Sequence, residues 1–169
     1  MKDYSTLEIG KALDIPRERL RDWMDRGFIK PTIAAKGQGT KAVFTKSDVY
    51  CVALFMELLE SGFSREVAAS WISLLDKPRK PQKADAGVVN YILFREGPRG
   101  SQEKPTLVTL EGIEWDLSLK TGVLGGSEKK QLINRDPFFQ EWAKQGWRKI
   151  FIVNFRQIRN EVDAALARL

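Results

Sequence analysis

Residues 16–31 constrain the fold more than any other part of the 169-residue sequence, and they read P-R-E-R-L-R-D-W-M-D-R-G-F-I-K-P. Proline suits the first position of a helix, and a proline beyond the end prevents the helix from continuing. Leu20, Trp23 and Met24 recur at the three- and four-residue spacing of one helix face. Gly27 follows as the expected C-cap, because glycine adopts positive φ at little cost. The segment therefore predicts one short helix with a buried face.

The polar face of this helix carries arginines. Arg17 and Arg21 lie near its start, and Arg19 is a third candidate for the same surface. An arginine can bond the O6 and N7 atoms of guanine with both branches of its guanidinium group, or it can bind phosphate. A helix with an exposed, arginine-bearing N-terminal half is therefore what a reader of the DNA major groove needs.

A first helix is expected just before this segment. Ser5 and Glu8 have the spacing of a capping box, and the apolar residues that follow predict a helix over about residues 7–13. Asp14 and Ile15 then leave room for only a very short turn. Two short helices joined this closely, the second one bearing arginines, form a helix-turn-helix pattern.

A glycine-rich basic hairpin, which we call the wing, is predicted over residues 33–44. Ile33 faces Val43 and Phe44 across a tip of sequence K-G-Q-G-T-K. Small residues at such a tip permit close approach to a phosphate backbone, and the lysines supply positive charge. A flexible surface loop is the alternative interpretation of the same residues.

Two longer helices are predicted after the wing. One begins at about residues 45–48, T-K-S-D, carries a broad apolar face and ends at Gly62, and Ser64 can cap the next. Residues 77–86, K-P-R-K-P-Q-K-A-D-A, then predict a linker, because they are polar, basic and rich in proline. The alternative role of this linker is a tether that follows a phosphate backbone.

The first part of the chain resembles the DNA-binding domain of MerR-type transcriptional regulators, over roughly residues 4–75. The likeness rests on the two short helices, on the wing ending in V-F-T-K-S-D-V, and on the following F-M-E-L-L-E-S-G-F-S. It implies a winged helix-turn-helix whose second helix enters the major groove of double-stranded DNA while the wing contacts the flanking backbone. Asp22 departs from that family's pattern, which often has an aromatic residue there, and an acid would repel DNA. From helix and wing together, the candidate DNA contacts are Arg17, Arg19, Arg21, Lys36, Gln38, Thr40 and Lys41.

The second half of the chain predicts a small α+β domain over residues 87–169. The expected strands span residues 88–94, 106–110, 113–119 and 150–153, with the second and third forming a hairpin, and a helix is expected from Asp136. Four aromatic residues fit either core packing or an apolar pocket for a small-molecule effector; they are Tyr91, Trp115, Trp142 and Trp147.

The chain closes with an apolar stripe, which we call the C-terminal seam: Phe155, Ile158, Val162, Ala165 and Leu169. These residues are three or four positions apart, so they share one helix face. The seam is too short for an isolated coiled coil and must pack on something. It can cover the sheet of its own domain, or it can join two subunits through the same helix or the first domain of the second. The MerR resemblance favours the second alternative, since these regulators act as dimers on two-fold operators.

Composition restricts the functions that this sequence can serve. One cysteine and no histidine exclude the ordinary Cys/His zinc sites and argue for a reducing cytoplasm. Without histidine, catalysis would depend on carboxylates, lysine, tyrosine or the lone thiol, so we expect no enzyme and no cofactor. The formal net charge of +6 fits a nucleic-acid partner. No apolar run is long enough to span a membrane.

These observations predict a cytoplasmic α+β protein with a winged helix-turn-helix domain over residues 1–76 and a small α+β domain, for dimerisation or effector binding, over residues 87–169. The predicted function is sequence-specific binding of double-stranded DNA as a homodimer, with regulation of transcription as its purpose. The alternative is a protein-interaction or phage/mobile-element accessory factor, in which the winged fold docks a partner or shapes DNA.

Overall fold

The chain forms two compact units, and its α+β class is the predicted one. The first unit consists of Met1–Ala86 together with Phe155–Leu169, and the second consists of Gly87–Asn154. The computed structural model describes residues 3–35, 41–75, 91–96, 106–108 and 149–169. Within these described ranges, no helix is long and apolar enough to cross a membrane.

The first unit begins with the two predicted short helices, α1 (Thr6–Ala12) and α2 (Arg17–Asp25). The capping box at the start of α1 is confirmed. The Glu8 N–H donates to the Ser5 hydroxyl at 3.3 Å, and the Ser5 N–H donates to the Glu8 carboxylate at 2.7 Å. Pro16 is the N-cap of α2, one position outside the place predicted for it. Local sequence therefore set both helix starts to within a residue.

The turn between α1 and α2 is tight because of two special backbone positions. A Cβ at Gly10 would lie 2.9 Å from the carbonyl oxygen of Ile15, whose N–H donates to the Gly10 carbonyl at 2.9 Å. Asp14 has a φ of +51°, in the left-handed region that Asp tolerates better than most residues. The C-cap of α2 is Arg26, one residue before the predicted Gly27, which follows it with a φ of +74°.

The stem of the wing is paired as predicted. Ile33 and Val43 form an antiparallel bridge, with N–H···O distances of 3.1 and 2.9 Å. The strand that contains Val43, β2 (Val43–Phe44), also pairs antiparallel with β1 (Tyr4–Ser5). The chain start and the wing therefore share one small sheet. The wing tip, residues 36–40, lies outside the described residues.

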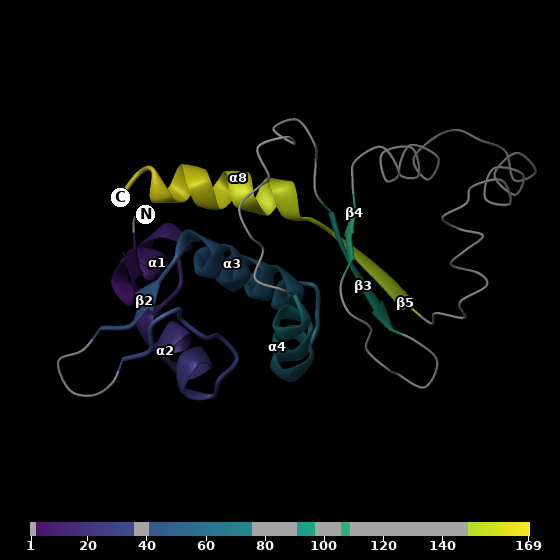
Figure 1. The fold of residues 1–169 in the computed structure, drawn as a ribbon, viewed down its shortest axis with the longest axis horizontal. Helices are drawn as coiled ribbons and strands as arrows, with labels where there is room; N and C mark the ends of the chain where they lie inside the picture. The colour runs from purple at the N-terminus through teal and green to yellow at the C-terminus, as the bar shows by residue number, and fades with distance from the viewer. Residues whose placement is uncertain (1–2, 36–40, 76–90, 97–105, 109–148) are drawn as a thin grey trace, which may run out of the picture. The chain divides into compact units, whose positions relative to one another are not determined.

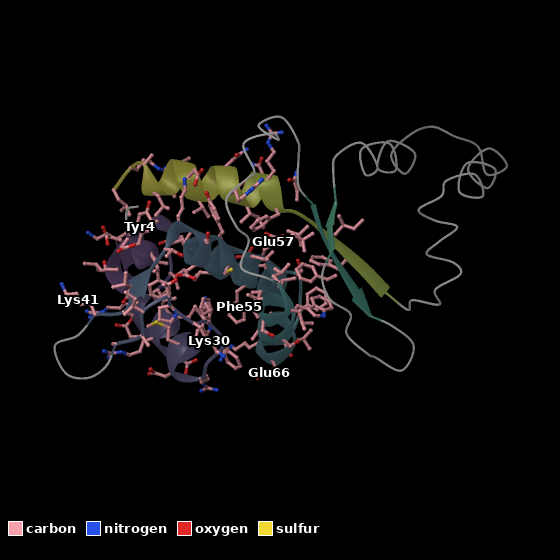
Figure 2. All side chains as sticks on the ribbon, in the orientation of Figure 1. Tyr4, Lys30, Lys41, Phe55, Glu57 and Glu66 are labelled. Carbon is pink, nitrogen blue, oxygen red and sulfur yellow. The ribbon has the colours of Figure 1, made fainter. Side chains whose placement is uncertain are left out.

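Two further helices follow in the N-terminal part of this unit. They are α3 (Lys46–Glu60) and α4 (Arg65–Leu74), with Thr45 and Ser64 as their N-caps. The core draws on every helix and on β2, and its buried side chains include Ile9, Leu20, Trp23, Phe44, Val49, Val52, Phe55, Leu58 and Ala68. Trp23 of α2 meets Phe55 of α3 edge-on, with ring centroids 5.0 Å apart and planes at 77°. Figure 2 shows Phe55 in the middle of the unit, between α2 and α4.

The C-terminal helix, α8 (Phe155–Leu166), packs along α3 and against α1 (Figure 1). The predicted C-terminal boundary of the second domain, at residue 169, is therefore wrong, because α8 belongs to the first unit. Four of the five seam residues, Phe155, Ile158, Val162 and Ala165, are buried within the single chain, while Leu169 is 47% exposed. The seam packs on α3. It thus packs within the chain, but on a different partner from the predicted sheet.

A polar clamp also fastens α8 to α3. The Tyr50 hydroxyl donates to Asp163 at 2.7 Å, and Lys46 Nζ lies 2.7 Å from the same carboxylate oxygen. The Tyr50 ring meets Phe155 edge-on, with centroids 6.2 Å apart. Burial, together with the hydrogen bond to Asp163, raises the pKa of Tyr50 to about 12. The hydrogen bond to Asp163 also raises the pKa of Lys46.

The second unit contains an antiparallel sheet in which β3 (Tyr91–Glu96) lies between β4 (Thr106–Val108) and β5 (Lys149–Asn154). Strands were predicted at all three places. Ile92 and its cross-strand partner Val153 are both buried. The expected strand 113–119 and its hairpin, the helix from Asp136 and the linker 77–86 lie outside the described residues, as do Trp115, Trp142 and Trp147.

Placing a charge in the seam tests its intrachain packing. Val162 is 2% exposed, so Val162→Glu buries a carboxylate without a partner and should lower the free energy of unfolding by several kcal/mol. Ala164→Glu adds the same charge on the exposed face of α8 and should change that free energy by less than about 0.5 kcal/mol. Urea melts at several protein concentrations give both values. A destabilisation by Val162→Glu that depends on concentration would show that the seam joins subunits instead.

The clamp predicts a pH dependence of stability at alkaline pH. The folded-state pKa of Tyr50 is raised from 10.0 to about 12, so the folded state holds the phenol proton more tightly than the unfolded state. This contribution is fully present below pH 10 and is lost as pH rises through about 12. Urea melts across that window should show that the free energy of unfolding falls as pH rises. This fall should be smaller in Tyr50→Phe than in the wild type. An unchanged pH profile in Tyr50→Phe would contradict the assignment.

Candidate nucleic-acid interface

A groove of about 450 Å³ opens between the start of α1, the length of α2 and the base of the wing. Its lining includes three cations, Arg17 and Arg21 from α2 and Lys41 from the wing, together with the carboxylate of Asp25. All three cations are exposed. Positive charge therefore exceeds negative charge along this groove, which suits an anionic partner.

The elements that carry the cations explain why they meet. Arg17 and Arg21 are four residues apart on α2, so they lie one above the other on one helix face. Lys41 reaches the same place because the pairing of Ile33 with Val43 brings the wing back toward α1. Figure 2 shows Lys41 at the side of the unit that lies away from α4.

Arg19, the third predicted arginine, lies on a different surface. Its guanidinium carbon is 5.8 Å from the centroid of the Trp23 ring, and it lines a separate hollow with Met56, Leu59 and Arg65. Two residues along a helix correspond to about half a turn, so Arg19 cannot share the face of its neighbours. Of the wing candidates, Lys36, Gln38 and Thr40 lie outside the described residues.

Asp22 is not an isolated acid on the surface of α2. Its carboxylate oxygens lie 2.7 Å from Arg26 Nε and 3.5 Å from an Arg65 guanidinium nitrogen. Exposed ion pairs of this kind contribute little to stability, but here they balance a negative charge on the helix that carries Arg17 and Arg21. The departure from the family pattern at this position is thus compensated by Arg26, the C-cap of α2, and by Arg65 of α4.

Two apolar residues of the groove were missed by sequence reasoning. Leu7, one of the apolar residues of α1, is 55% exposed and lines the groove. Met24, expected on the buried face of α2, also lines it and is only half-buried. Apolar groups at a DNA-facing surface can contact the methyl group of thymine. Periodicity in the sequence identifies Leu7 and Met24 as apolar positions, but it does not show which apolar residue stays uncovered.

The family model described as MerR HTH family regulatory protein matches residues 4–74. Residues 4–74 are a MerR-type helix-turn-helix domain. The matched segment is less than half of the chain and supports DNA binding in the regulation of transcription as its general role. No curated protein matches the sequence. In the described part of the chain, no cluster of three or more His, Cys, Asp or Glu side chains could hold a metal ion.

Removing single arginines from α2 tests the groove. Arg21→Ala should weaken binding to a specific duplex by about 1–3 kcal/mol if its guanidinium reads a base, with little change in melting temperature because the side chain is exposed. Arg19→Ala is the matched control, since it removes the same charge from the other face of the same helix. Fluorescence anisotropy with a labelled duplex gives both affinities. Equal losses would show that net charge, and not the groove, controls binding.

Proposed function

We propose that this protein binds specific double-stranded DNA sequences as a cytoplasmic homodimer and thereby regulates transcription, without enzymatic activity. The observation that carries the proposal is the groove in which Arg17, Arg21 and Lys41 meet on one side of a MerR-type domain. The two arginines of α2 support the proposal of sequence-specific binding. Lys41 supports the proposal of contact with phosphate.

The groove combines the two kinds of contact that a specific DNA-binding protein needs. Phosphate contacts fix the position of the protein on the duplex, while contacts to base edges select the sequence. A recognition helix presents its first residues to the bases, and Arg17 and Arg21 lie in the first half of α2. Lys41 is at the base of the wing, where a flanking phosphate would lie if α2 entered the major groove.

The homodimer in this proposal follows from the size of α2 and from the family. A helix of nine residues reaches only a few base pairs, and two such helices on half-sites one DNA turn apart multiply the specificity. MerR-type regulators act on two-fold operators in this way. The subunit contact that we propose lies outside the face formed by Phe155, Ile158 and Val162, because α3 already covers that face.

The proposed function predicts a steep dependence of affinity on salt. The logarithm of the association constant should fall linearly with the logarithm of the salt concentration, with a slope of roughly −0.9 for each phosphate contacted. Selection of bound genomic fragments followed by hydroxyl-radical footprinting should give two protected half-sites about 34 Å apart, and sedimentation should give two chains for each site.

The variant with Arg17, Arg21 and Lys41 all replaced by Ala is the control for this experiment, and it should have a much shallower slope. Affinity for duplex that is independent of salt, or no retention of duplex at all, would contradict the proposal. That result would favour the alternative in which the domain docks a protein partner.

A further inference from the structure

Asp48, in the first turn of α3, is a charged side chain in the interior of the first unit. It is 2% exposed. A carboxylate is costly to bury unless hydrogen bonds replace its water. The groups that donate hydrogen bonds to the Asp48 carboxylate must therefore be held in place.

One oxygen of Asp48 accepts three hydrogen bonds. The Thr45 N–H donates at 2.8 Å, the Thr32 hydroxyl at 2.5 Å and the Thr32 N–H at 3.1 Å. The bond from Thr45 belongs to the capping box of α3, in which the Asp48 N–H also donates to the Thr45 hydroxyl at 3.3 Å. The two bonds from Thr32 have no part in that capping box, and they reach sixteen residues back along the chain.

Thr32 and Thr45 are the two residues that bracket the wing. Thr32 directly precedes Ile33, and Thr45 directly follows β2. A single carboxylate oxygen therefore holds both ends of the hairpin to the first turn of α3. The backbone pair of Ile33 and Val43 comes next, so the hairpin leaves the domain from a closed and fixed base.

We infer that Asp48 is the positioning residue of the wing. Its carboxylate fixes the direction in which the hairpin leaves the domain, and so it keeps Lys41 in the same groove as Arg17 and Arg21. If Asp48 only capped α3, its hydrogen bonds with Thr45 would be sufficient and the two from Thr32 would not be required. The consequence for DNA rests on the proposed function, whereas the consequence for the hairpin does not.

Thr32→Val is the variant that separates these roles. It removes the hydroxyl that donates to Asp48, keeps nearly the same shape, and leaves the capping box of Thr45 and Asp48 intact. Asp48→Ala would remove the cap and the anchor of the wing together and could simply fail to fold. Ser64→Ala is the control, because it removes one side-chain hydrogen bond, 3.3 Å from the Val67 N–H, at the cap of α4 in the same unit.

Amide hydrogen exchange reports on the hairpin without any DNA. The N–H groups of Ile33 and Val43 should exchange roughly ten- to a hundredfold faster in Thr32→Val than in the wild type, the change expected when a hydrogen bond to a charged group is removed. Ser64→Ala, compared at equal global stability from urea melts, should leave these two rates unchanged. Unchanged exchange at Val43 in Thr32→Val would overturn the inference.

The salt dependence of duplex affinity then tests the link to binding. In Thr32→Val the slope should become shallower by about 0.9 for each phosphate that the wing no longer reaches. Protection of the flanking backbone should weaken in the same variant, while Ser64→Ala keeps the wild-type slope. Faster exchange with an unchanged slope would overturn the role of Asp48 in placing Lys41. A wild-type protein that binds no duplex would instead defeat the proposed function and leave the exchange result standing.

Discussion

The first unit depends on the burial of α3 by more than one neighbour. Phe55 packs edge-on against Trp23 of α2, and other apolar residues of α3 meet α4 on one side and α8 on another. A helix that is apolar on several faces has to be covered on all of them. For this reason the first unit does not end at α4, and α8 completes it.

The candidate DNA groove follows from the same central helix. Trp23 fixes α2 to α3, and the hydrogen bonds of Asp48 fix both ends of the wing to the start of α3. Two elements that carry the cations are thus anchored to one support, about two turns apart along it. An interface assembled in this way needs no long-range attraction between the cations, which repel one another. The packing energy of the core holds Arg17, Arg21 and Lys41 together.

The closure of this unit joins distant parts of the chain. Tyr50 and Asp163 share a hydrogen bond across 113 positions, and the whole of the second unit lies between them in the sequence. Asn154 ends β5 and Phe155 begins α8, so no residue separates the sheet of one unit from the helix that completes the other. Contacts of such long sequence separation carry a large loop-closure cost, which the burial of the seam offsets.

The sequence by itself determined the local structure: the capping box of Ser5 and Glu8, the stop at Gly27, the helix-turn-helix, the paired wing stem and the strands of the second unit. These signals work within short stretches of the chain, where hydrogen-bond geometry and side-chain period leave few choices. Only the tertiary structure decided that the seam covers α3, that Arg19 leaves the face of Arg17 and Arg21, and that Asp22 is paired with two arginines. An apolar stripe or a charge in a sequence shows that it needs a partner, but the partner is chosen by distant residues that compete for the same surface.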